Sequence, residues 1–159
     1  MQTPRMRYAL PALAVAAALG VTGCGGSSGT SKADFKKQYG PVDSQLKALG
    51  TRLGTTITSA SGKTDAQLAS ELDGESTQLG SLLTKMRGIK APSKTKSDYQ
   101  ELQSQLGQVH TDLTQLTSAA RTHNASSAKT STVRLITDVQ AIKPTANRVR
   151  ASVGLPQSG

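Results

Sequence analysis

The stretch LQSQLGQVHTDLTQLTSAA, residues 102–120, decides the fold of this chain. Its large apolar residues recur at steps of three and four, from Leu102 and Leu106 to Val109 and Leu113, and polar residues fill most positions between them. This spacing gathers the apolar side chains on one face of an α-helix. The stretch therefore predicts an amphipathic helix with a narrow apolar seam.

The same spacing occurs in three further stretches, and no stretch alternates between apolar and polar residues as a half-buried strand does. The four predicted helices cover about residues 32–60, 64–89, 92–122 and 125–153. Short connections between helices of this length favour an all-α fold, an antiparallel up-down four-helix bundle over residues 32–155, with a tail at 156–159. The alternative is that the first two helices form a long hairpin that pairs with another molecule.

Residues at the expected helix ends support these limits. Thr64, with Gln67 three residues later, predicts a capping box at the start of the second helix. Pro92 is expected in the first turn of the third helix, and Asn124 is expected to cap the fourth through its side-chain oxygen. Gly154 is expected to end the fourth helix, because glycine readily adopts the left-handed conformation found there.

The composition limits both the core and the partners. Of the 159 residues, 35% are hydrophobic and 3% aromatic, so Leu, Ile, Val and Ala must build most of the core. The net charge of +9 favours acidic partners such as anionic lipids, teichoic acids or acidic proteins. Nucleic acid is not expected as a partner, because aromatic residues for stacking on bases are lacking.

The N-terminal segment, residues 1–23, has the pattern of an export signal. Arg5 and Arg7 precede YALPALAVAAALGV, residues 8–21, an apolar stretch that is shorter than the ~20 residues of a transmembrane helix. The only cysteine, Cys24, follows after Thr22 and Gly23, and a single cysteine excludes an internal disulfide.

The sequence VTGC, residues 21–24, resembles the lipobox of bacterial lipoproteins, although Val21 replaces the commoner leucine. The resemblance implies that signal peptidase II cuts between Gly23 and Cys24 and that Cys24 carries a diacylglyceryl anchor, with palmitate as a typical acyl chain. Residues 24–31 are then the lipidated cysteine and a flexible Gly/Ser tether. The abundance of Ala, Thr, Ser and Gly resembles small actinobacterial lipoproteins. The alternative is an ordinary secretory signal that contains a cysteine.

This resemblance implies a location on the extracytoplasmic face of the cell membrane, or on the outer membrane if the cell is Gram-negative. In an antiparallel bundle, the start of the first helix, the connection between the second and third helices and the end of the fourth share one end. We call it the tether end, because Cys24 precedes the first helix. It is expected to carry 11 of the 17 basic residues that remain after residue 23, namely Lys32, Lys36, Lys37, Lys85, Arg87, Lys90, Lys94, Lys96, Lys143, Arg148 and Arg150.

Such a basic end is expected to rest on anionic lipid head groups, where each Lys or Arg contributes about 1 kcal/mol. Ordinary solvated helix termini are the alternative. The helix dipole explains cations in last turns, but not those near helix starts, such as Lys32 and Lys96.

The three aromatic residues of the predicted bundle also fall at the tether end, together with two prolines inside helices. One hypothesis is a small apolar pocket there, lined by Phe35, Tyr39, Pro41, Tyr99 and Pro144. The alternative, which we favour, is that the aromatic rings simply fill a wider part of the core.

The sequence holds no arrangement of residues that predicts catalysis. His110 and His123 lack partners at metal-ligand spacing, so no metal site and no cofactor are expected. Glu75 lies near the seam of the second helix, and a small rotation is expected to turn Ser76 inward and Glu75 toward water. The predicted function is a non-catalytic, lipid-anchored binding or envelope-interaction module, without an identified protein partner. The alternative is a carrier or sensor of a small apolar or envelope-derived ligand in the pocket at the aromatic and proline end.

Overall fold

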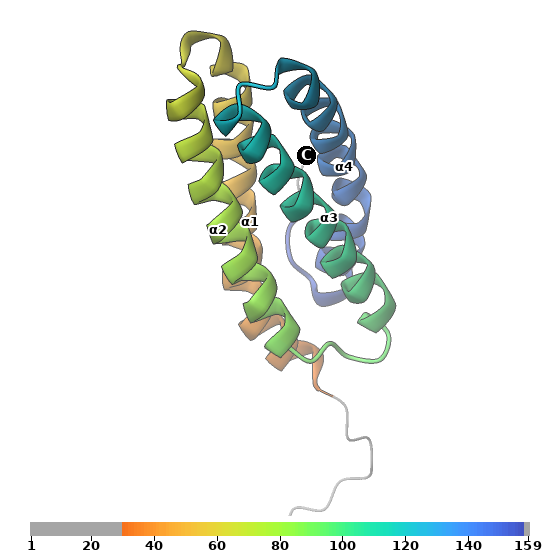
Figure 1. Ribbon diagram of the computed structural model, residues 1–159. Helices are drawn as coiled ribbons and strands as arrows, with labels where there is room; N and C mark the ends of the chain where they lie inside the picture. Colours follow the sequence, from red (N-terminus) through yellow and green to blue (C-terminus); the bar gives the residue numbers. More distant parts are fainter. Residues whose placement is uncertain (1–29, 158–159) are drawn as a thin grey trace, which may run out of the picture.

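The computed structural model describes residues 30–157. The predicted signal peptide at 1–23, the cleavage site at Gly23 and Cys24, and residues 25–29 of the tether lie outside the described residues. Within them the chain forms four helices, α1 (Lys32–Thr58), α2 (Asp65–Gly88), α3 (Lys96–Arg121) and α4 (Ala125–Val153), and a short 3-10 turn at Ala60–Gly62. Consecutive helices run antiparallel, which confirms the predicted all-α up-down bundle (Figure 1).

The caps explain where the helices begin and end. The Thr64 side chain accepts from the backbone of Gln67, whose side chain accepts from the backbone of Thr64 in return, so the capping box is present. Asn124 Oδ1 accepts from the Ser127 N–H at 3.0 Å. Gly154 ends α4 with φ of 69°, as expected of a left-handed C-cap.

The start of α3 differs from the prediction. The helix begins at Lys96, so Pro92 lies in the connection before it and not in its first turn. Residues 92–95 instead form a separate turn, in which the Thr95 N–H donates to the Pro92 carbonyl at 2.9 Å. Thr95 is buried and donates its hydroxyl to Ser152 of α4 at 3.0 Å, which holds this turn against the end of the last helix.

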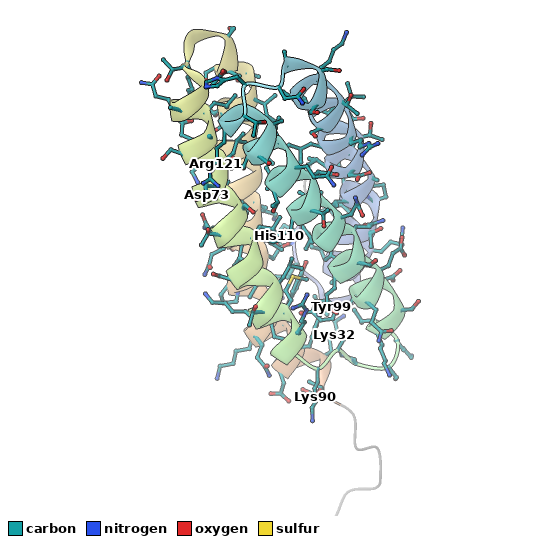
Figure 2. All side chains as sticks on the ribbon, viewed as in Figure 1. Lys32, Asp73, Lys90, Tyr99, His110 and Arg121 are labelled. Carbon is teal, nitrogen blue, oxygen red and sulfur yellow. The ribbon has the colours of Figure 1, made fainter. Side chains whose placement is uncertain are left out.

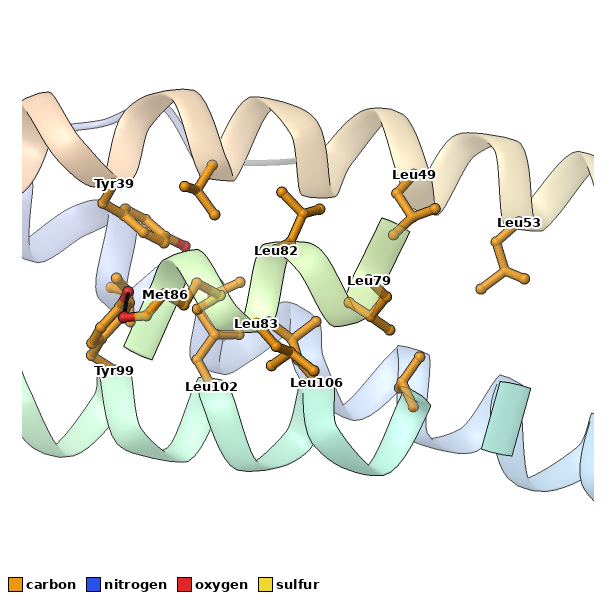
Figure 3. Close-up of a cluster of buried hydrophobic side chains, with 14 of the residues drawn as sticks. Tyr39, Leu49, Leu53, Leu79, Leu82, Leu83, Met86, Tyr99, Leu102 and Leu106 are labelled. Atoms are coloured by element: carbon orange, nitrogen blue, oxygen red, sulfur yellow. Dashed lines mark hydrogen bonds between the residues drawn. The ribbon is translucent and has the colours of Figure 1, made fainter. Parts of the chain in front are cut away.

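The core consists mainly of leucine side chains from all four helices. Leu72, Leu113 and Leu135 are completely buried, and Leu49 and Leu53 point inward from α1 (Figure 3). Each large aliphatic side chain that is fully buried stabilises the fold by about 1.5–3 kcal/mol.

The four helices do not contact one another equally. α3 packs extensively against both α2 and α4, and α1 packs against α2, whereas the contacts between α1 and α4 are sparse. The bundle is therefore least closed along the α1–α4 edge.

Candidate functional site

The tether end carries a group of exposed basic side chains from three parts of the chain. Lys32 near the start of α1 and Lys90 after the end of α2 mark this end in Figure 2. We call eight exposed cations at this end the basic group: Lys32, Lys36, Lys37, Lys85, Arg87, Lys90, Lys94 and Lys96. No carboxylate within residues 30–157 lies at salt-bridge distance from any of them.

Three basic residues predicted for this surface behave differently. Arg150 is buried, and its Nε donates to Asp43 Oδ1 at 2.7 Å, so the prediction that it faces a membrane is wrong. Arg148 is exposed, but it donates to Asp98 and Glu101, both at 2.8 Å. Lys143 is exposed but lies ten residues before the end of α4, about 15 Å from the helix terminus.

Two cations at the opposite end of the bundle are paired with acids. Lys63 contacts Glu71, and Arg121 Nη2 lies 3.2 Å from Asp73 Oδ2 (Figure 2). The His123 ring lies 2.5 Å from Asp65. The two ends therefore differ in the charge that they leave uncompensated at the surface, and the positive excess is at the tether end.

The aromatic residues fill the tether end of the core. The Phe35 and Tyr39 rings stack with centroids 5.3 Å apart, and Tyr99 meets both edge-on at 5.0 and 5.6 Å. Burial raises the pKa of both tyrosines, and Tyr99 donates its hydroxyl to the Met86 carbonyl at 2.9 Å. Pro41 and Pro144 lie inside their helices but face the solvent.

These positions correct the predicted pocket. The rings of Phe35, Tyr39 and Tyr99 pack against one another, which agrees with the favoured alternative that they fill the core. An apolar cavity of about 130 Å³ lies instead in the middle of the bundle, beside the α1–α4 edge. Of the five predicted pocket residues only Tyr39 lines it.

The wall of this cavity is aliphatic except near the tether end. Leu46 and Leu53 of α1 and Val139 and Ile142 of α4 are among its lining residues. Their spacing in the sequence predicts that they lie in the core. It does not show that α1 and α4 pack sparsely against each other and leave a cavity between them.

A buried ion pair adjoins the cavity. Asp43 and Arg150 are each 5% exposed and connect α1 to α4 across the sparsely packed edge. Asp43 also accepts from the Tyr39 hydroxyl at 3.3 Å and lies 3.3 Å from Lys47 Nζ. The pair was not predicted from the sequence, because 107 residues separate its members. The only signal available was that Asp43 directly follows the seam residue Val42.

Two further carboxyl groups are buried away from the tether end. Glu75 is 7% exposed and accepts from the Thr56 hydroxyl at 2.8 Å, so the expectation that it turns toward water is wrong, although Ser76 does face inward. Asp112 is completely buried, beside Asp138. One oxygen each of Glu75 and Asp112 has no hydrogen-bond partner within the described part of the chain.

Loss of solvation raises the pKa of both buried carboxyl groups, and the nearby Asp138 raises that of Asp112 further. Because these folded-state pKa values exceed the unfolded ones, the folded state binds protons more readily. The two groups therefore disfavour folding at neutral pH, and this cost falls as the pH drops through the raised values.

We expect the double variant Glu75→Gln/Asp112→Asn to be more stable than the parent chain at pH 7. Its gain in stability should shrink as the pH approaches the unfolded-state pKa values of 4.5 for glutamate and 3.8 for aspartate, because the parent carboxyl groups then protonate. Urea unfolding at several pH values measures the difference. An advantage that does not change with pH, or a loss of stability at pH 7, would contradict this account.

The histidines lie apart. His110 is half-buried and lies in the middle of α3, whereas the His123 side chain is 75% exposed beyond the end of the same helix. Within residues 30–157 no group of three or more His, Cys, Asp or Glu side chains is placed to hold a metal ion.

Comparisons with known proteins found no relative of this chain. No protein-family model, no curated protein and no solved structure matches this chain. Among the described helices, none has both the length and the apolar character needed to cross a membrane.

Proposed function

We propose that this protein is a lipid-anchored, extracytoplasmic and non-catalytic bundle whose tether end binds an anionic membrane surface. The observation that supports this proposal most directly is the basic group, eight exposed cations without a carboxylate at salt-bridge distance among residues 30–157. Lys63 and Arg121 at the other end of the bundle have acidic partners, so a surface of negative charge attracts the tether end more strongly.

The place of the basic group in the topology also supports the proposal. Residues 30 and 31 lead into α1 at this end, and the proposed lipid anchor at Cys24 precedes them in the sequence. The seven residues between Cys24 and Lys32 span at most about 25 Å when extended. A diacylglyceryl anchor on Cys24 would therefore keep the basic group close to the lipid head groups, where exposed cations contribute most.

The test uses residues 24–159 with Cys24→Ser, which retain every described contact but cannot be lipidated. We expect this chain to bind vesicles that contain phosphatidylglycerol and to release them as salt is added. Binding to pure phosphatidylcholine should be much weaker. Equal binding to both vesicles, insensitive to salt, would remove the proposal.

Two variants of equal net charge show which end binds. Replacing four cations of the basic group is expected to weaken binding by about 10²–10³-fold, at about 1 kcal/mol for each residue, in Lys32→Gln/Lys90→Gln/Lys94→Gln/Lys96→Gln. The control removes the same charge elsewhere, in Lys63→Gln/Arg121→Gln/Lys129→Gln/Arg134→Gln, and should retain most of the binding. Circular dichroism checks that both remain helical. Equal losses of vesicle binding in the two quadruple variants would show that only net charge matters and would contradict a membrane-facing end.

A further inference from the structure

The cavity beside the α1–α4 edge is accessible from the surface. All four helices contribute to its wall, and three of its lining residues, Lys47, Gly50 and Val139, are exposed. A side chain is missing where the cavity meets α1, because a Cβ at Gly50 would find no heavy atom within 4 Å. The cavity therefore opens between α1 and α4, the edge at which the bundle is least closed.

Its size and shape suit a hydrocarbon chain. The volume is about 130 Å³, and an engineered dry apolar cavity of about 150 Å³ in another protein binds benzene. The lining residues on α4 run from Val139 to Arg150, which corresponds to about 16 Å along the helix axis. A small volume spread over this length is narrow, so it fits an alkyl chain better than a ring system.

The two ends of the cavity differ in polarity. Asp43, Lys47 and Arg150 line the end nearer the tether, whereas Leu53 and Val139 lie toward the other end. Asp43 carries one negative charge against the positive charges of Arg150 and Lys47, so this end has an excess of one positive charge. Lys47 is 41% exposed in its side chain, and its ammonium can therefore reach a ligand at the opening.

From these observations we propose that the cavity binds a single-chain fatty acid, with the alkyl chain along the α1–α4 edge and the carboxylate beside Lys47. The aliphatic wall takes the chain out of water, and each buried methylene group contributes about 0.8 kcal/mol. The excess positive charge selects an anionic head group over a neutral or cationic one. This site is separate from the basic group, and the proposal does not depend on membrane binding.

Calorimetric titration of residues 24–159 carrying Cys24→Ser tests the proposal with three amphiphiles of equal chain length, each below its micelle concentration or solubility limit. We expect laurate to bind with a stoichiometry of one and at least tenfold more tightly than dodecyltrimethylammonium. Dodecanol should bind with intermediate affinity. Equal affinity for laurate and the cationic amphiphile would overturn the head-group assignment, and the absence of saturable binding would overturn the site.

A matched pair of substitutions places the ligand. Gly50 lines the cavity and Gly54, one turn later, does not, yet a Cβ at either position would meet no heavy atom within 4 Å. We expect Gly50→Leu to fill the opening and weaken laurate binding at least tenfold, and Gly54→Leu to bind like the parent chain. Equal binding by Gly50→Leu and Gly54→Leu would show that laurate binds elsewhere.

The head-group contact has its own variant. Lys47→Gln should weaken laurate binding several-fold and leave dodecanol binding unchanged, because only the carboxylate uses the ammonium. Both leucine variants and Lys47→Gln are expected to keep the helical circular dichroism of the parent, since all three positions are exposed. A loss of dodecanol binding equal to that of laurate would show that Lys47 acts on the fold of the cavity and not on the head group.

Discussion

Replacing Arg150 by leucine is expected to lower the free energy of unfolding by about 3–5 kcal/mol. The substitution leaves Asp43 buried without the guanidinium that donates to it at 2.7 Å. Lys47 and the Tyr39 hydroxyl, each 3.3 Å away, remain as partners but are less close. A carboxylate that is removed from water and loses its main counter-charge is costly, so the expected loss is large.

Two controls separate this effect from a general sensitivity of α4. Arg148→Leu removes an arginine two residues earlier, but its partners Asp98 and Glu101 are solvent-accessible and are rehydrated when it is lost, so a much smaller change is expected. The double variant Asp43→Leu/Arg150→Leu removes both buried charges and should recover most of the stability. Urea unfolding measures all three. Equal losses in Arg148→Leu and Arg150→Leu would contradict the assignment of a buried ion pair.

Phe35→Ala is the second substitution with a large expected effect, a loss of about 3–5 kcal/mol. Phe35 is completely buried and contacts both Tyr39 and Tyr99 through ring packing. Removing its ring leaves a void between two tyrosines, and aromatic pairs contribute about 0.5–1.5 kcal/mol beyond the area that they bury.

The control for this prediction is Phe35→Leu, which keeps most of the buried volume and should lose clearly less stability than Phe35→Ala. Thermal and urea unfolding measure both variants. Were the two substitutions to cost the same, the volume that leucine retains would contribute nothing measurable, and the loss would come from the ring contacts with Tyr39 and Tyr99.

Much of the fold was predictable, because local chemistry determines it. The four apolar seams indicate four helices. The capping residues Thr64, Asn124 and Gly154 are adjacent in sequence to the helix ends that they determine. The start of α3 was missed because a proline is equally acceptable in a first turn and in the turn before a helix. Thr95, which binds Ser152 of α4, decides between these two, and that contact is not local.

The site was less predictable, because it depends on which flank of a helix faces which neighbour. Periodicity identified Tyr39 and Leu46 as inward residues, but it could not show that Asp43 faces Arg150 across the α1–α4 edge. The cost of burying a carboxylate without a partner predicts that Glu75 faces water, whereas Thr56 on α1 provides a hydrogen bond that lets the carboxyl lie inside. The grouping of exposed cations at one end did follow from the sequence, since it requires only the antiparallel topology.

The two proposals make independent demands on the molecule. Membrane binding depends on exposed cations at the end of the bundle, and fatty-acid binding depends on a cavity farther along it. A protein with both properties would hold an amphiphile close to the surface of the bilayer, with its charged end directed toward the lipid head groups. The variants Lys94→Gln and Gly50→Leu act on different proposals, so the failure of one leaves the other standing.

The sparse packing between α1 and α4 also determines how the bundle carries mechanical load. A pull on the chain that precedes α1 enters a helix supported along its length mainly by α2. On the other side α1 is held near its start by Lys36, which donates to the Gly154 carbonyl at 2.8 Å, and farther along by Asp43 and Arg150. The resistance of α1 to such a pull therefore depends on these polar contacts and on the packing of Phe35 and Tyr39 against Tyr99.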